Sequence, residues 1–371
     1  MQLPESEELE ISNLSSVFSD TTNSYKFYWF LSILDSLQEK NECIISLDDL
    51  ALRMIARVWY PLDYFKLSFG KQDGFKPIAE FVTSKFEVNN TINSPSLFSQ
   101  LNNKLSLEDS VILRKKVVEL LRWVPYRFLR PYFSNETKGL PDHQVNGRII
   151  ELANLYFHTN PKRVIYKFSG DKIILNPIWA NYFQKHQTIL KGFIYWHLIK
   201  FLQKNNPNVV GLSEKLEKPI QRDLKVANSF WKEYLNENSV VCIYSEQELT
   251  LQNWSLDHFL PWSFVVHDQL WNIVPTSKNV NSVKGNWLPS IDHYMDKYIN
   301  SQFEALKYHV KKENFRLLED YTNLFSQDSE YLKPLTLEAF GKSIKKHILP
   351  QFQTARNMGF GYPFVYVQNN K

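Results

Sequence analysis

Glycine and cysteine are both scarce in this sequence of 371 residues, which holds 11 glycines and 2 cysteines. Few glycines argue against a glycine-rich nucleotide-binding fold. The one fragment that resembles a phosphate-binding loop, Gly341–Ser343, lacks the glycine that such a loop needs at the position of Thr336. Cys43 and Cys242 lie far apart and give no disulfide framework, which favours a reducing cytoplasm.

Long apolar runs are also missing. No window approaches the ~18 uninterrupted apolar residues that a membrane span needs. The first 20 residues contain five acidic side chains and no basic one, and they lack the apolar core of a signal peptide. We therefore expect a cytoplasmic protein. Apolar residues still make up 43% of the chain and aromatic residues 15%, enough to fold two or three domains.

Positive charge is concentrated in one segment, although the net charge is only +4. Residues 111–133 carry six basic side chains against the single acid Glu119, with aromatic residues between them. This combination suits contacts with nucleic-acid phosphates and stacking on bases. An amphipathic helix with a solvated basic face explains the pattern equally well, so both interpretations stay open. The candidate nucleic-acid-binding residues are Arg114, Lys115, Lys116, Arg122, Arg127 and Arg130.

Polar side chains of a catalytic type gather between residues 256 and 289. The set begins with the pair Asp257-His258. Asn272 lies 14 residues after His258, Asn281 lies nine residues after Asn272, and Lys284 lies three residues after Asn281. A carboxylate and an amide oxygen are hard donors that suit Mg²⁺ or Mn²⁺. Imidazole titrates near neutral pH and therefore suits a general base. Each residue alone has an ordinary structural explanation, such as an Asx turn or a helix cap, so the argument depends on their joint spacing.

This set resembles the HNH endonuclease (ββα-metal) family, and its separations resemble those of the HNH domain of RNA-guided CRISPR effectors. The resemblance implies that Asp257 and Asn281 hold Mg²⁺ or Mn²⁺ and that His258 is the general base that activates water. It implies that Asn272 pins the loop that carries the histidine. Lys284, one helical turn after Asn281, is expected to contact the scissile phosphate or a neighbouring one.

The chain departs from zinc-reinforced members of that family. Their zinc is held by two Cys-x-x-Cys pairs, whereas here the residue three positions after Cys242 is Ser245, and Cys43 is the only other cysteine. We therefore expect no structural zinc. Asn281 stands where colicin-type relatives have histidine, which favours Mg²⁺ or Mn²⁺ over Zn²⁺ or Ni²⁺. For His267 and Asp268, in the loop between strand and helix, we expect a structural or DNA-contacting role rather than metal ligation.

The local pattern predicts a β-β-α unit. We expect strands at 240–244 and 254–259 and a short helix capped by Thr276 or Ser277 and ended by Gly285. The two prolines within 124–133 predict turns or extended chain there. Elsewhere the pattern predicts a hairpin at 164–175 and helices at 24–40, 47–60, 106–123, 178–204, 212–234, 292–324 and 337–348.

The fold class is thus expected to be α+β, a mainly α-helical protein carrying a ββα-metal finger. We expect a mainly helical N-terminal region at 1–235 for recognition of substrate or partner, the HNH domain at 236–290, and a helical C-terminal segment at 291–371. The predicted function is a metal-dependent endonuclease that cuts DNA, by analogy in bacterial defence or restriction. Because one finger cuts one strand, double-strand cleavage would need a homodimer or two successive events. The alternatives are a nucleic-acid-binding module and a nuclease subunit of a defence complex, active only with a protein partner.

Overall fold

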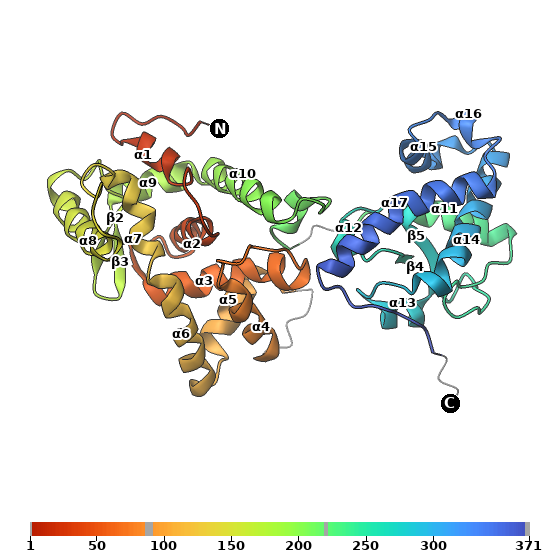
Figure 1. The fold of residues 1–371 in the computed structure, drawn as a ribbon, viewed down its shortest axis with the longest axis horizontal. Coiled ribbons are helices and arrows are strands. Elements are labelled where there is room, and N and C mark those ends of the chain that lie inside the picture. The colour runs from red at the N-terminus through yellow and green to blue at the C-terminus, as the bar shows by residue number, and fades with distance from the viewer. Residues whose placement is uncertain (1, 86–91, 219–221, 368–371) are drawn as a thin grey trace. The chain divides into compact units, whose positions relative to one another are not determined.

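The computed structural model describes residues 2–85, 92–218 and 222–367. It is mainly helical with two small antiparallel sheets, so the predicted α+β class is confirmed. The chain divides into two compact units (Figure 1). The first comprises Met1–Pro207 and Lys215–Lys218, and the second comprises Asn208–Glu214 and Pro219–Lys371. Among the described residues, no helix is long and apolar enough to cross a membrane.

The helix α2 (Tyr25–Lys40) is the centre of the first unit, where it packs against α3, α7, α9 and α10. It is buried on most sides because its aromatic and aliphatic residues surround the helix axis, from Phe27 to Leu37. The predicted helix at 24–40 is therefore confirmed. The other helices of this unit are α1 (Ile11–Ser16), α3 (Leu47–Trp59), α4 (Phe75–Lys85), α5 (Ser94–Asn103), α6 (Leu107–Leu121), α7 (Val124–Leu129), α8 (Asp142–Thr159), α9 (Pro177–Lys185) and α10 (Gln187–Asn205), with a π-helical turn at Tyr60–Tyr64 and a 3₁₀ turn at Arg130–Phe133. A further 3₁₀ turn, Leu212–Lys215, has its first three residues in the second unit and Lys215 in the first.

A three-stranded antiparallel sheet belongs to the same unit. The predicted hairpin is present as β2 (Tyr166–Ser169) and β3 (Lys172–Leu175), and Gly170 in its turn has the positive φ of 59° that glycine adopts easily. The strand β1 (Ile44–Ser46), which the sequence did not predict, pairs with the other edge of β3.

The prediction of turns or extended chain at 124–133 is wrong. This segment forms α7 and the 3₁₀ turn Arg130–Phe133. Pro125 and Pro131 each lie in the first turn of their helix, where a missing N–H costs no intrahelical hydrogen bond. Proline therefore starts these helices rather than breaking them.

The second unit packs helices around a two-stranded hairpin. The hairpin consists of β4 (Trp254–His258) and β5 (Ile273–Ser277), and the short helix α13 (Lys278–Lys284) follows it directly. The long helices α11, α14 and α17 contribute to one apolar core with the hairpin. Besides α13, the helices of this unit are α11 (Lys225–Glu237), α12 (Trp262–Val265), α14 (Ile291–Lys311), α15 (Glu319–Phe325), α16 (Ser329–Leu332) and α17 (Leu337–Asn357), with 3₁₀ turns at Leu270–Asn272 and Phe315–Leu317.

The pairing within the predicted β-β-α unit is wrong in one respect. β4 pairs with β5 and not with residues 240–244, which form a turn with a single bridge between Val241 and Glu248. β5 was not predicted because it contains Pro275, and proline usually argues against a strand. In a sheet of two strands each strand is an edge, so Pro275 is tolerated opposite Leu256.

The helix α11 packs in the second unit, although the expected N-terminal region extended to residue 235. Its Trp231 donates a hydrogen bond of 3.0 Å from Nε1 to the carbonyl of Ile273, and Phe230 stacks on His309. These contacts close the core beneath the hairpin. The functional division of the chain into three parts stays a prediction.

Candidate active site

The residues predicted for catalysis converge on β4 and the elements around it. Asp257 and His258 are the last two residues of β4, paired with Val274 and Ile273 of β5. Both are nearly buried, with exposed fractions of 3% and 5%. The turn that carries Tyr244 and the helix α13 supply the groups that bind Asp257.

The Asp257 carboxylate is held by two side chains. Tyr244 donates a hydrogen bond of 2.8 Å to Oδ2, and Lys284 Nζ lies 3.1 Å from the carboxylate. Burial, and then the Asp257 charge, raises the pKa of Tyr244 well above its usual value, so its phenol stays protonated and donates. Burial lowers the pKa of the Lys284 ammonium group, and the charge of Asp257 offsets part of this effect.

Lys284 also donates a hydrogen bond of 2.7 Å to the backbone carbonyl of His258. Its side chain is fully buried. It therefore links α13 to the end of β4 at the point where both catalytic candidates lie. The expected contact of Lys284 with a phosphate stays a prediction, and in the free protein the ammonium group binds these two acceptors.

The imidazole of His258 is bound to a carboxylate that the sequence did not assign to it. Its Nε2 lies 2.8 Å from Oδ1 of Asp268, ten residues further along the chain. Burial acts to raise the pKa of Asp268, but the hydrogen bond and charge of His258, the N–H of Asp223 and the charge of Arg222 outweigh it and leave the pKa lowered. An ionised carboxylate only accepts hydrogen bonds, so a neutral His258 ring that donates to Asp268 from Nε2 has its lone pair on Nδ1.

Asn272 and Asn281 bind the backbone on either side of the pair Asp257-His258. Asn272 accepts a hydrogen bond of 2.9 Å from the N–H of Leu260 and donates one of 3.0 Å to its carbonyl. Asn281 donates from Nδ2 to the carbonyl of Leu256 at 2.9 Å and to Ser255 Oγ at 3.1 Å. Both of these bonds use the amide nitrogen of Asn281. Its Oδ1, which lies beside β4, is therefore the atom that could bind a metal ion.

The oxygen atoms of Asp257 and Asn281 are of the kind that binds a divalent ion with few protein ligands. Among the described residues, no group of three or more His, Cys, Asp and Glu side chains is arranged to hold a metal. The predicted pair, one carboxylate and one amide oxygen, instead matches a hard ion that keeps several waters and binds substrate phosphate. The two contacts on Asp257 leave lone pairs on its carboxylate, because a carboxylate offers about four acceptor sites.

Cys242, where a zinc pair would begin, lies in the core. Its Sγ is 3.1 Å from the hydroxyl of Thr276 in β5. This contact fastens the start of the 242–247 turn to the hairpin. Tyr244 projects from the same turn to Asp257.

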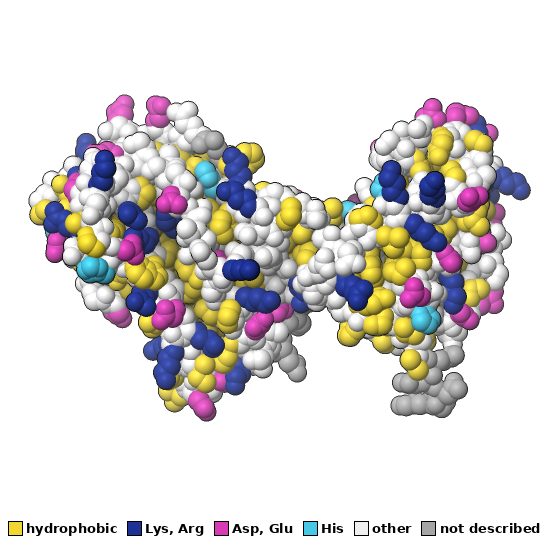
Figure 2. Space-filling view, viewed as in Figure 1, with side chains coloured by type: hydrophobic (Ala, Val, Ile, Leu, Met, Phe, Trp, Pro, Cys, Tyr) yellow, Lys and Arg dark blue, Asp and Glu magenta, His cyan; other side chains and the backbone are white. Residues whose placement is uncertain are grey.

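The predicted nucleic-acid-binding residues lie on α6, at the residue after its end (Arg122), on α7 and in the 3₁₀ turn that follows α7. α6 buries Leu113, Val117 and Leu120 and leaves Arg114 and Lys115 exposed, and Figure 2 shows Lys and Arg side chains gathered over this helix. Such a basic face agrees with both interpretations of residues 111–133, a nucleic-acid-binding surface and a solvated helix face. The six residues differ in environment: Arg114, Lys115, Arg122 and Arg130 are exposed, whereas Lys116 and Arg127 are partly buried.

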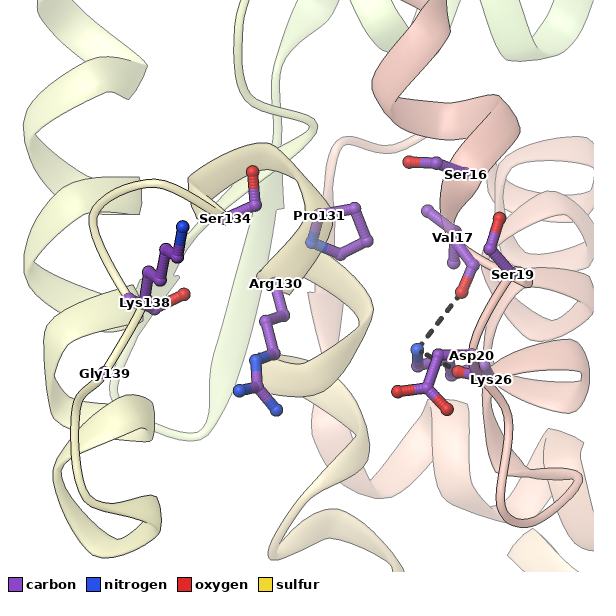
Figure 3. A pocket seen from close by; sticks show the side chains of 11 residues that line it. Ser16, Val17, Ser19, Asp20, Lys26, Arg130, Pro131, Ser134, Lys138 and Gly139 are labelled. Atoms are coloured by element: carbon purple, nitrogen blue, oxygen red, sulfur yellow. Dashed lines mark hydrogen bonds between the residues drawn. The ribbon is translucent and has the colours of Figure 1, made fainter.

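Arg127 and Arg130 have different surroundings. Arg127 is 15% exposed and pairs with Asp142 at 2.8 Å. Arg130 lines a cavity of about 410 Å³ opposite Lys26, which bonds the carbonyls of Val17 and Asp20 at 3.1 and 2.9 Å (Figure 3).

Comparison with known proteins agrees with the resemblance seen in the sequence. Residues 242–290 match the model of the HNH endonuclease family, a segment that starts at Cys242 and includes the hairpin and α13. No curated protein and no solved structure matches the chain. The chain therefore carries a domain of the HNH endonuclease family, and this domain supports nuclease activity on nucleic acid.

Proposed function

We propose that the protein is a metal-dependent endonuclease that hydrolyses DNA phosphodiester bonds, with His258 as the general base. The observation that carries this proposal is the contact of 2.8 Å between His258 Nε2 and Asp268 Oδ1. With the proton on Nε2, Nδ1 would be the proton acceptor. Beside it, Asp257 is oriented by Tyr244 and Lys284. A nuclease needs such a base next to a hard oxygen donor.

Asp257 and Asn281 would hold the Mg²⁺ or Mn²⁺ ion. When bound there, the ion would polarise the scissile phosphate and stabilise the charge on the leaving oxygen. Asp257 is the only carboxylate in this pair, and Lys284 compensates part of its charge. A site with so little negative charge should bind the ion more tightly when a DNA phosphate supplies further oxygen ligands.

In the proposed reaction, a water molecule activated by His258 attacks the phosphorus atom. Nδ1 of His258 takes a proton from the water, and the water oxygen forms a bond to phosphorus. The P–O3′ bond breaks, and the departing O3′ takes a proton from solvent, which leaves a 5′-phosphate and a 3′-hydroxyl. Asn272 supports the step indirectly, because its two hydrogen bonds to Leu260 hold the chain that leaves the histidine.

For the N-terminal region we propose recognition of DNA through the exposed basic residues of α6 and its continuation, chiefly Arg114, Lys115 and Arg122. A role in bacterial defence or restriction is proposed by analogy with HNH proteins that carry a large helical extension. The second candidate is a subunit that cuts only when a protein partner presents the substrate. It is favoured by the size of the first unit, which nuclease chemistry does not require.

The test is cleavage of a supercoiled plasmid by wild type and by His258→Ala, with Mg²⁺, with Mn²⁺ and with EDTA. We expect metal-dependent nicking or linearisation by wild type and a loss of at least ~100-fold in His258→Ala, because general-base catalysis contributes about that much or more. DNA affinity and the unfolding transition should change little. His293→Ala, at an exposed histidine of the same unit, is the matched control and should retain activity.

Two outcomes would contradict this assignment. Full activity of His258→Ala would exclude His258 as the base. Absence of cleavage by wild type with either metal, while DNA binding persists, would favour the partner-gated subunit.

A further inference from the structure

The carboxylate of Asp268 connects the His258 imidazole to the segment that precedes α11. Oδ1 lies 2.8 Å from His258 Nε2, and Oδ2 accepts a hydrogen bond of 2.9 Å from the backbone N–H of Asp223. Arg222, adjacent in the chain, has its guanidinium 5.0 Å from the centre of the Trp262 ring and contributes positive charge near the carboxylate. Each oxygen of Asp268 therefore has its own donor.

The loop that carries Asp268 is fixed by other groups as well. At its end, the N–H of Leu270 donates a hydrogen bond of 2.7 Å to Asp320, and Asn272 binds the backbone of Leu260. At its start, Val266 closes α12 with a backbone bond of 2.8 Å to Trp262. These contacts hold the loop on both sides and do not involve the bond from Asp268 to the histidine.

We propose that Asp268 is the positioning residue of the nuclease: it fixes the tautomer and the rotation of the His258 ring so that Nδ1 faces the attacking water. This inference rests on the proposed function of His258. A carboxylate bound to one imidazole nitrogen places the proton on that nitrogen and leaves the other as the base. The N–H of Asp223 contributes by fixing how the carboxylate is turned.

The isosteric variant Asp268→Asn gives the sharpest test. The N–H of Asp223 is a donor, so it will keep the amide oxygen and turn the NH₂ group towards His258 Nε2. An NH₂ donor requires Nε2 to be an acceptor, which moves the ring proton to Nδ1 and removes the base. Asp268→Ala imposes no tautomer, so part of the population keeps a free Nδ1.

We therefore expect Asp268→Asn to be more damaging than Asp268→Ala, with losses in the single-turnover cleavage rate of at least ~100-fold for Asn. The Kd for DNA should stay within a factor of about two for both variants, since neither change removes a positive charge. A purely structural role would give the opposite order, because asparagine preserves the shape of the side chain and alanine does not. Equal or milder damage by asparagine would overturn the proposal.

Asp320→Asn is the matched control. Asp320 is also a partly buried carboxylate that accepts a backbone hydrogen bond from this loop, but it has no bond to His258. We expect its cleavage rate to remain within a few-fold of wild type. A loss as large as that of Asp268→Asn would show that the loop, and not the ring of His258, is what the carboxylates support.

A second measurement does not depend on cleavage. Ring ¹⁵N shifts of ¹⁵N-histidine-labelled full-length protein at alkaline pH distinguish the two tautomers, and a His258→Gln spectrum assigns the signal. We expect the Nε2–H form in wild type and the Nδ1–H form in Asp268→Asn. An Nδ1–H ring in wild type would overturn the proposal even if the protein proved inactive on DNA, so failure of the inference and failure of the proposed function are distinguishable.

Discussion

Asn272 shows how one side chain can hold the backbone of an active site. It is fully buried, and both ends of its amide bind the backbone of Leu260, which is also buried. Asn272→Ala would leave a donor and an acceptor unpaired inside the second unit. We expect the free energy of unfolding to fall by about 1–3 kcal/mol and the cleavage rate to fall with it, because His258 lies two residues from Leu260.

Urea unfolding of the full chain, with cleavage measured on the same samples in the absence of urea, checks this expectation. Asn279→Ala is a suitable control, since Asn279 is exposed and its side chain donates a hydrogen bond of 3.3 Å to the hydroxyl of Tyr366. Its effect should remain within about 0.5 kcal/mol. If the two variants proved equally stable, the hydrogen bonds of Asn272 would not contribute to the fold.

Single residues also mark the limit of what the sequence could predict about this site. Asp257, His258, Asn272 and Asn281 could be selected because their types and separations form a recognisable set. The contacts of Tyr244 with Asp257 and of Asp268 with His258 could not be predicted, because both depend on loops whose course no periodic pattern specifies. A carboxylate ten residues after a histidine carries no signal of its own until the loop between them folds back.

At the scale of elements, α13 was predicted correctly and its cap is open to test. Ser277 Oγ accepts a hydrogen bond from the N–H of Val280 at 3.3 Å, and Gly285, with φ of 47°, ends the helix. Ser277→Ala should lower the free energy of unfolding by about 0.5–2 kcal/mol. Because α13 carries Asn281 and Lys284, we also expect weaker binding of Mn²⁺, measured by calorimetry.

Ser277→Asp is the matched variant, because aspartate caps a helix as well as serine does. It should restore the stability that alanine loses. A variant pair with equal stability would show that packing of the seven-residue helix against the hairpin, rather than its cap, determines whether it forms.

Three of the elements that the sequence mispredicted share one cause, which is proline. Pro275 concealed β5, and Pro125 and Pro131 concealed α7 and the turn after it. In each case the position of the proline decides its effect: an edge strand and the first turn of a helix both tolerate a missing N–H. A single sequence does not reveal these positions before the pairing and the helix starts are known.

For the whole molecule, the boundary between the units was harder to predict than the site. The HNH motif begins near residue 240, but the second unit also includes α11, whose Trp231 binds the carbonyl of Ile273 in β5. Closing the core under a hairpin of only two strands requires such additional helices, since so small a sheet is marginal by itself. Motif boundaries and folding units therefore differ here for a physical reason.

The first unit offers a test of DNA recognition that leaves the catalytic residues untouched. Lys115 and Arg122 are exposed, whereas Arg127 pairs with Asp142 and would disturb the fold if reversed. We expect Lys115→Glu combined with Arg122→Glu to weaken DNA binding and to reduce the slope of log K against log salt by about one for each phosphate that the variant no longer neutralises. Lys185→Glu combined with Lys204→Glu, at exposed sites on α9 and α10, makes the same change in net charge and should leave the slope nearly unchanged. Equal effects of the two pairs would mean that only total charge matters, and no effect of either would support the interpretation of α6 as a solvated basic face.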